Sequence, residues 1–315
     1  DAYETAPDSC EKCSAPAADM KQDEDVLDTW FSSALWPFAT LGWPDETKEM
    51  KMFFPTTILS TAREIINLWV ARMIFTSLKF TKTIPFKHVL IHPVIQTEDG
   101  KRMSKSKGNS IDPLDMIDTY GADANRFWFT SVGIKGDQDV RFRAEKLDEY
   151  KRFANKLWNA GRFVLAQLEG FEPKGVNPAH LTLADRWILN RYNVLLDLLQ
   201  MYFQDYDFDK AANQLHDFTW SAFCDWYVEI AKIQLAQEAQ LSSQAGAQAG
   251  ETTGQTRAVL QTIFEGLLRA LHPIMPFITE ELWTKVPKSS FFPKDFVSIM
   301  FAPYPRPDEN LIDDD

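Results

Sequence analysis

The sequence of 315 residues predicts part of a parallel α/β sheet followed by an all-α helical bundle. Two observations predict this fold class. Residues 50–95 contain short apolar runs, typical of buried strands, on either side of one long helical run. From residue 113 onward, apolar residues recur at helical spacing in one segment after another. A chain of this length can form two domains, each with its own core.

The α/β part is a strand, helix, strand unit. Residues 50–59 and 88–95 predict the strands, and residues 62–80, which lack Pro and Gly, predict the helix between them. One face of this helix carries the apolar residues Ile65, Ile66, Trp69, Val70, Met73 and Ile74. A helix that connects two neighbouring strands makes them parallel, and ligands bind at the carboxyl ends of parallel strands. The second strand leads into residues 98–113, so we expect that segment at the ligand edge.

The helical part begins with well-marked helix ends. Asp112 and Pro113 predict the start of one helix and Gly121 predicts its end. The next helix has an apolar stripe and stops before the Gly/Pro-rich linker 170–178. The members of that stripe are Leu147, Tyr150, Phe153, Leu157, Ala160 and Val164. Thr182, with Asp185 three residues later, predicts the start of another helix that carries Ile188, Leu195 and Leu199.

Further helices are predicted over 209–237, 257–271 and 279–283. The first of these lacks Pro and Gly, and its spacing turns Ala212, Leu215, Ala222 and Trp226 inward. Residues 236–256 are rich in Gln, Ala, Gly and Ser and low in hydrophobicity, which predicts a flexible loop. Together these helices predict a bundle.

Composition limits the class of protein. The formal charge of -12 argues against bulk capture of nucleic acid, although a local basic patch can still bind it. No apolar run is long enough to span a membrane and no leader peptide precedes the first folded segment, so we expect a cytoplasmic protein. We further expect it to be a monomer. Three cysteines fit a reducing compartment. Cys10 and Cys13 form half of a tetrahedral zinc site or, alternatively, two exposed thiols in a linker.

A basic loop lies at the expected ligand edge. Lys101, Arg102, Lys105 and Lys107 fall within seven positions, among the small residues Ser104, Ser106 and Gly108. Ammonium and backbone N–H groups stabilise charge on phosphate oxygens, most of all when that charge develops in a transition state. On composition alone a solvated charged loop is the favoured interpretation, and a phosphate site is the alternative.

Residues 102–106, Arg-Met-Ser-Lys-Ser, resemble the Lys-Met-Ser-Lys-Ser signature of class I aminoacyl-tRNA synthetases, and residues 106–127 continue as in those enzymes. Other segments resemble the valine-specific members of the class: 24–44, 67–75, 139–142, 152–165 and 223–232. Residues 272–283 resemble the isoleucine and leucine members as well. The resemblance covers nearly the whole chain, apart from 236–256 and the two tails.

The resemblance implies the second half of a Rossmann-like nucleotide-binding domain, followed by a helical anticodon-binding domain. The implied parts are 1–20, the end of an editing insertion or a linker; 21–118, the catalytic half; 119–159, the stem-contact region; 160–302, the anticodon-binding domain; and 303–315, a tail. The sequence lacks the His-Ile-Gly-His signature of the class. We therefore expect these residues alone to be inactive, with the editing insertion before them and a coiled-coil arm after them.

The activity implied by the resemblance is ATP-dependent activation of valine to valyl-adenylate and transfer to tRNA(Val), with Mg²⁺ accompanying ATP. Lys105 and Arg102 would be catalytic, and Lys105 would stabilise the triphosphate transition state. The implied ATP contacts are Ala62, Glu64, Met103, Ser104, Lys105 and Ser106. The implied valine contacts are Trp30, Ile65 and Trp69, of which the last two share a helix face. Without the resemblance, both tryptophans would be assigned to the core.

Three of these positions depart from the class pattern. Arg102 replaces a lysine and keeps its charge in a planar group. Ala62 replaces a glycine, and Glu64 replaces an aspartate, at the implied contact with the ATP ribose. Two alternatives therefore stay open: an isoleucyl or leucyl relative, and a non-catalytic tRNA-binding remnant of a synthetase.

Candidate tRNA contacts are the cations near the junction of the two implied parts. They are Arg126, Lys151, Arg152, Lys156 and Arg162. Cations on helix surfaces are usually only solvated, whereas phosphate contacts make affinity strongly salt-dependent.

Overall fold

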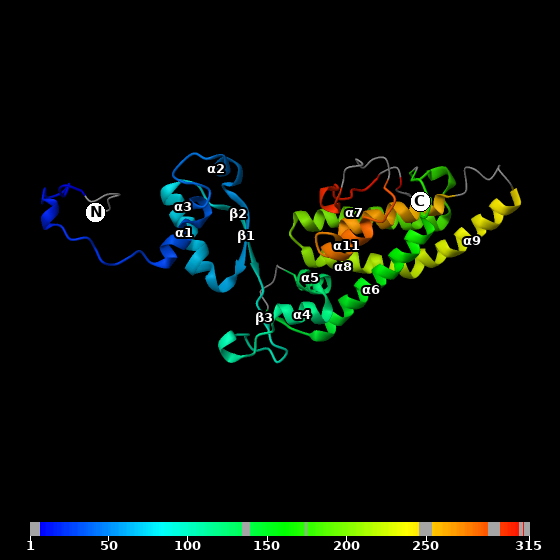
Figure 1. The fold of residues 1–315 in the computed structure, drawn as a ribbon, viewed down its shortest axis with the longest axis horizontal. Helices are drawn as coiled ribbons and strands as arrows, with labels where there is room; N and C mark the ends of the chain where they lie inside the picture. The colour runs from blue at the N-terminus through cyan, green and yellow to red at the C-terminus, as the bar shows by residue number, and fades with distance from the viewer. Residues whose placement is uncertain are drawn as a thin grey trace. The chain divides into compact units, whose positions relative to one another are not determined.

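The computed structural model describes residues 7–133, 139–173, 175–245, 254–288, 297–308 and 311. The chain divides into two compact units, Asp1–Leu90 and Ile91–Asp315 (Figure 1). Each unit is described by itself. No helix in the described ranges combines the length and apolar character needed to cross a membrane.

The first unit contains the predicted strand, helix, strand sequence. Its elements are α1 (Thr29–Ala39), α2 (Lys48–Phe53), β1 (Thr56–Ala62), α3 (Ala71–Phe80) and most of β2 (Phe86–His92), whose last two residues belong to the second unit. β1 and β2 are neighbours in a two-stranded sheet. The N–H of Thr56 donates to the C=O of Pro85 at 2.9 Å, which joins the beginnings of both strands and makes them parallel.

The boundaries of these elements differ from the predicted ones. Residues 50–53 belong to α2 and not to a strand, because Thr47 caps that helix by accepting the N–H of Met50 at 3.0 Å. The predicted helix 62–80 begins as a 3-10 turn, Arg63–Ile65, and a π-helix, Ile66–Val70, before α3. The second predicted strand is divided into β2 and the short β3 (Ile95–Gln96).

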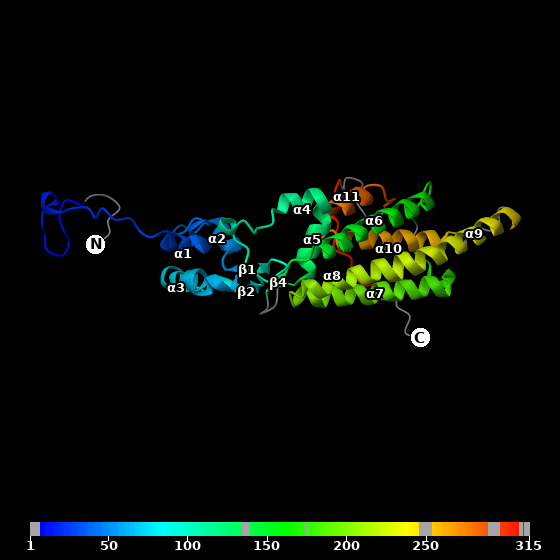
Figure 2. The same cartoon turned by 90° about the horizontal axis from the view of Figure 1, so that it is seen from below.

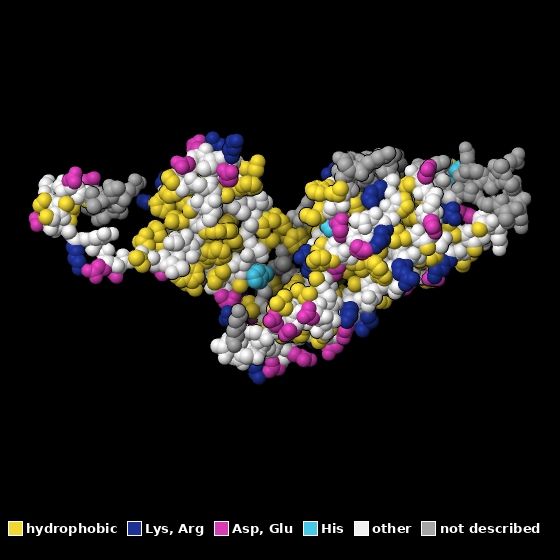
Figure 3. Space-filling view, viewed as in Figure 1, with side chains coloured by type: hydrophobic (Ala, Val, Ile, Leu, Met, Phe, Trp, Pro, Cys, Tyr) yellow, Lys and Arg dark blue, Asp and Glu magenta, His cyan; other side chains and the backbone are white. Residues whose placement is uncertain are grey.

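The core of the first unit is small and leaves apolar residues on the surface. Leu59, Val70, Met73 and Phe86 form one buried cluster. Phe38 of α1 is fully buried, with the ring of Trp43 at 5.4 Å. Large apolar side chains stay exposed in this unit, among them Met52, Phe53, Phe75 and Ile84, and hydrophobic atoms cover much of its visible face (Figure 3).

The second unit is a helical bundle preceded by a short parallel β-pair, β3 with β4 (Val140–Arg141). Its helices are α4 (Pro113–Tyr120), α5 (Ala122–Ser131), α6 (Ala144–Gln167), α7 (Leu183–Gln204), α8 (Phe208–Asp217), η6 (Phe218–Tyr227), α9 (Val228–Ala245), α10 (Gln255–Leu271) and α11 (Pro276–Trp283). The long helices lie along one another in both views (Figures 1 and 2). The fold class is therefore confirmed: a parallel sheet segment followed by a helical bundle.

Local sequence signals placed the helix ends well. Asp112 caps α4 by accepting the N–H of Leu114 at 2.8 Å, and the helix ends at Gly121, whose φ is 89°. Thr182 and Asp185 form a reciprocal capping box at the start of α7. Every member of the predicted α6 stripe is buried in the bundle core: Leu147, Tyr150, Phe153, Leu157, Ala160 and Val164.

The predicted helix 209–237 is correct in kind and wrong in detail. Ala212, Leu215 and Ala222 are buried, but Trp226 is 65% exposed. Residues 218–227 form a π-helix with i→i+5 bonding, so residues four apart no longer share a face. The loop predicted from residue 236 is also wrong up to Ala245, the end of α9. Residues 246–253 of that loop lie outside the described residues.

A polar latch closes one end of the bundle. The carboxylate of Asp123 on α5 accepts the N–H of Phe277 at 3.2 Å and of Ile278 at 2.7 Å, and so caps α11. Arg126, three residues after Asp123 on α5, donates to the C=O of Ile274 at 3.0 Å and of Pro273 at 2.9 Å. The segments around 121–127 and 272–283, which the sequence marked separately, thus bind each other.

Candidate functional site

The implied valine residues lie together in one pocket. Trp30 of α1, Ile65 and Trp69 line a cavity of about 220 Å³ in the first unit, together with Ser33 and Trp36. Ile65 ends the 3-10 turn and Trp69 lies in the π-helix, so irregular backbone between β1 and α3 forms this wall. Single π-helical turns are frequent at functional sites. The pocket is apolar, with mainly aromatic walls.

Contacts between the lining residues, and one with Arg72, hold the walls of the pocket in place. The indole N–H of Trp69 donates to the C=O of Ser33 at 3.1 Å, and the ring of Trp36 lies 6.0 Å from that of Trp69. The guanidinium of Arg72 lies 5.5 Å from the centre of the Trp30 ring, a cation–π distance. Sequence reasoning missed Ser33 and Trp36, although Ser33 lies three residues after Trp30, and Trp36 three after Ser33, the spacing of neighbours on a helix surface.

The basic loop is anchored at its base by a strand pair. Gln96 pairs with Arg141 in the β3–β4 ladder, and its side chain donates to Asp139 at 2.7 Å. An isolated bridge joins Gln96 to Arg102 at the start of the signature loop, which we define as residues 102–107. Residues 139–142, another segment that carried the resemblance, therefore hold the strand that leads into this loop.

The charges in this stretch are not equivalent. Lys101 forms an ion pair with Asp99 at 2.6 Å. The hydrogen bond from Lys101, supported by one from Thr97, lowers the pKa of Asp99 to about 2. The contribution of Lys101 to the positive charge of the stretch is therefore offset by Asp99. Within the signature loop, the hydroxyls of Ser104 and Ser106 are hydrogen-bonded at 2.7 Å.

The implied ATP residues fall into two groups. Ala62 ends β1 and Glu64 follows in the 3-10 turn, one residue before Ile65 of the valine pocket. Arg102, Met103, Ser104 and Ser106 lie in the signature loop of the second unit, as does the backbone of Lys105. Glu64 is exposed, and Met103 and Ser104 are partly buried.

The bundle uses three of the five candidate tRNA cations internally. Arg126 belongs to the latch, and Lys151 donates to the C=O of Thr119 at 2.8 Å. Lys156 forms an ion pair with Asp225. Arg152 and Arg162 are exposed on α6.

A surface with interleaved cations and aromatic rings lies on α6, η6 and α9. We call it the α6–α9 face. It consists of Lys156, Phe163, Trp220 and Lys232, together with Trp226, which is 65% exposed and directly follows Asp225, the ion-pair partner of Lys156. The ammonium of Lys156 lies 4.2 Å from the Trp220 ring centre, and that of Lys232 lies 5.4 Å from the Phe163 ring centre. Lys and Arg side chains are visible along this part of the bundle (Figure 3). Of its aromatic residues only Phe163 has a basic neighbour in the sequence, Arg162, so the sequence gives little signal for this face.

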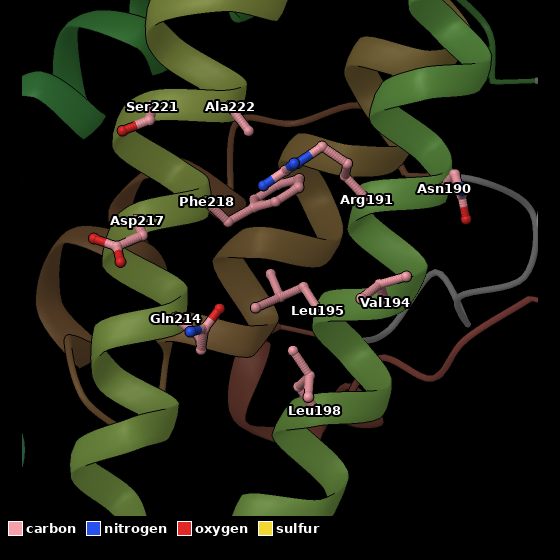
Figure 4. Close-up of a pocket in the computed structure, with 10 residues that line it drawn as sticks. All are labelled: Asn190, Arg191, Val194, Leu195, Leu198, Gln214, Asp217, Phe218, Ser221 and Ala222. Carbon is pink, nitrogen blue, oxygen red and sulfur yellow. The ribbon is translucent and has the colours of Figure 1, made fainter.

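A larger cavity of about 690 Å³ lies between α7 and the α8–η6 helix. Leu195, Leu198 and Phe218 give it an apolar lining, and Arg191 reaches into the space from α7 (Figure 4). Asp217 and Ser221 point away from that space (Figure 4). The cavity is chemically unlike a triphosphate site.

The described residues bring together no group of three or more His, Cys, Asp or Glu that could hold a metal ion. Cys10 and Cys13 are neighbours in a tight turn, in which the N–H of Ser14 donates to the C=O of Cys10 at 2.8 Å. Two thiols supply two of the four ligands of a structural zinc site.

Comparisons with known families match both parts of the chain. Residues 2–142 match the family described as tRNA synthetases class I (I, L, M and V). Residues 185–315 match the anticodon-binding domain of tRNA ligase. The chain belongs to the class I aminoacyl-tRNA synthetases.

Within this class, the chain is similar to valine–tRNA ligases. It is 48% identical to that of Carboxydothermus hydrogenoformans over 298 residues, which cover 95% of this chain and 32% of the relative. It is 44% identical to that of Thermotoga maritima over 307 residues, covering 98% and 33%. The chain thus spans about one third of the length of these curated relatives.

Solved structures support the fold. The LeuRS chain in a LeuRS–tRNA–LeuAMS complex of Agrobacterium radiobacter K84 matches with a TM-score of 0.73 and 18% identity, over 97% of this chain and 35% of that one. Mycobacterium tuberculosis methionyl-tRNA synthetase, in complex with methionyl-adenylate, matches with a TM-score of 0.58 and 18% identity, over 78% and 47%. At such identity the likeness establishes the fold alone.

Proposed function

We propose that this chain is the valine-binding and loop-bearing part of a valine–tRNA ligase. The observation that carries the proposal is the aromatic pocket of Trp30, Ile65 and Trp69, in a chain similar to valine–tRNA ligases over nearly all of its length. An apolar pocket with rigid aromatic walls accepts a small branched side chain and excludes larger ones by steric overlap.

The reaction has two steps. An oxygen of the valine carboxylate attacks the α-phosphorus of ATP, which forms valyl-adenylate as the bond to pyrophosphate breaks. A hydroxyl of the tRNA then attacks the valyl carbonyl and displaces AMP. The signature loop supplies Arg102 and Lys105 to the triphosphate, where fixed positive charge stabilises the charge that moves onto pyrophosphate. Mg²⁺ that accompanies ATP would add to the same stabilisation.

The nucleotide contacts in the first unit follow from the position of Ala62 and Glu64 beside the pocket. Glu64 would accept hydrogen bonds from ribose hydroxyls, and the methyl group of Ala62 would lie against the sugar. Placing the ribose next to the pocket brings the α-phosphate toward the valine carboxylate.

For tRNA, we propose the α6–α9 face as a contact surface. Unpaired bases stack on aromatic side chains. Lys156 and Lys232 are paired with Asp225 and Glu229, so we expect the exposed ring of Trp226, and not the lysines, to make the main contact. Most of the face, Trp220, Trp226 and Lys232, falls within the segment that matches an anticodon-binding domain. Arg162, exposed on α6 next to Phe163, would add a phosphate contact.

A chimera tests the activity. The matched 298-residue segment of the Carboxydothermus hydrogenoformans ligase is replaced by this chain. We expect ATP–pyrophosphate exchange that depends on valine and prefers valine to isoleucine, and no exchange by this chain alone. Exchange that prefers isoleucine or leucine would contradict valine specificity. A folded chimera without exchange would favour the tRNA-binding remnant.

Replacing Trp226 tests the tRNA surface. We expect Trp226→Ala to weaken tRNA binding about tenfold, because stacking of one base contributes roughly 1–3 kcal/mol. Stability should change little, since the side chain is 65% exposed. The dissociation constant is measured by fluorescence anisotropy at several salt concentrations. Trp187→Ala, on α7 and outside the face, is the matched control, and equal losses for both variants would refute the assignment.

A further inference from the structure

We propose that Asn109 is a positioning residue that holds the signature loop in the conformation needed for adenylate formation. The inference deepens the proposed function and rests on it. Neither the sequence patterns nor the comparisons assign a role to Asn109, which lies just beyond the loop.

The amide side chain of Asn109 bridges back to the loop backbone. Its Oδ1 accepts the N–H of Ser104 at 2.9 Å, and its Nδ2 donates to the C=O of Arg102 at 3.2 Å. One planar amide thereby binds a donor and an acceptor two residues apart, as a neighbouring β-strand would. The two limbs of the loop are tied together by this side chain.

The backbone between the two limbs allows the bridge to form. Residues Lys105–Lys107 form a 3-10 turn, and Gly108 follows with a φ of +63°, a conformation that glycine adopts without steric cost. The chain therefore turns back, and Asn109 comes to lie beside Ser104. The C=O of Ser104 accepts the N–H of Lys107 at 3.1 Å. Both backbone groups of Ser104 are thus fixed, immediately before Lys105.

A fixed backbone before Lys105 would favour adenylate formation. Charges that stabilise a transition state act best when they are already in place, because no reorganisation is then needed during the reaction. Without the Asn109 bridge, the backbone before Lys105 must be ordered in each turnover. The effect should fall on kcat of adenylate formation and leave the KM for valine unchanged, since Trp30, Ile65 and Trp69 belong to the other unit.

The test uses the chimera with Asn109→Leu, which has a similar size and no hydrogen-bonding group, and Asn109→Asp, which keeps only the acceptor. Asn177→Leu is the matched control, because Asn177 makes a comparable local bond by accepting the N–H of Ala179 at 3.1 Å, in a turn before α7. We expect Asn109→Leu to lower kcat of valine-dependent exchange about tenfold or more, the loss of two hydrogen bonds. The valine KM should stay within about twofold, and Asn109→Asp should retain part of the activity.

Hydrogen exchange of the peptide covering 102–108 gives a second readout, independent of activity. Faster exchange in Asn109→Leu, with an unchanged melting temperature, supports the bridge. Unchanged hydrogen-exchange rates in this peptide, or an unchanged kcat of ATP–pyrophosphate exchange, would overturn the inference. If the parent chimera has no activity, the proposed function fails with it, and hydrogen exchange still decides whether Asn109 orders the loop.

Discussion

Glu265→Ala is expected to lower the free energy of unfolding of the bundle by about 3–5 kcal/mol, because it removes the buried carboxylate that pairs with the mostly buried Arg269. Glu265 is 3% exposed and accepts two bonds from Arg269, from Nε at 2.8 Å and from Nη2 at 2.7 Å. It also accepts the indole N–H of the fully buried Trp283 at 2.7 Å. Arg269 in turn donates to the C=O of Pro303 at 2.7 Å, so the network connects α10, α11 and the C-terminal segment.

Urea unfolding followed by circular dichroism measures this loss. Glu281→Ala is the matched control, since Glu281 of α11 forms an exposed i,i+4 ion pair with Lys285, two residues beyond the end of that helix. That exposed pair should contribute less than about 1 kcal/mol. A loss from Glu265→Ala no larger than that of Glu281→Ala would show that the buried network does not stabilise the bundle.

Lys105→Ala is expected to lower valine-dependent exchange in the chimera by about 10²–10³-fold, the usual effect of removing one group that stabilises transition-state charge. The KM for valine should be unchanged, because in the proposed function the ammonium would act on the triphosphate and not on the amino acid. The measurement is the rate of exchange at saturating valine and ATP.

Lys107→Ala provides the comparison for Lys105. Lys107 carries the same charge at the other end of the 3-10 turn and is exposed. We expect a loss of less than about tenfold, because a screened surface charge contributes little. Equal losses would mean that the loop acts through its net charge alone and that Lys105 has no special position.

Signals confined to a few residues predicted the structure well. Asp112 and the pair Thr182 and Asp185 identified helix starts, because a capping side chain bonds backbone groups only two or three residues away. The α6 stripe predicted the core, because a regular α-helix keeps its period over its length. Trp226 was assigned wrongly where a π-helix changes that period, which the sequence alone does not announce.

The part of the candidate site that depends on local helical spacing was predicted from the sequence, and the part that depends on packing was not. Ile65 and Trp69 were grouped from their spacing, and the structure places both in one pocket with Trp30. Trp36 and the Ser33 carbonyl contact depend on the packing of α1 against the π-helix. Likewise, Asn109 acts through a loop that turns back on itself, so its partners are set by backbone geometry and not by a repeating pattern.

The latch between α5 and α11 also constrains the order of events during synthesis. Asp123 and its partner Phe277 are separated by 154 positions, so the ribosome translates the whole of α6 to α10 before the contact can close. At about 5–20 residues per second, this takes roughly 8–30 s. During that interval α5 lacks its partner, and the carboxylate of Asp123 accepts hydrogen bonds from water until α11 has been synthesised.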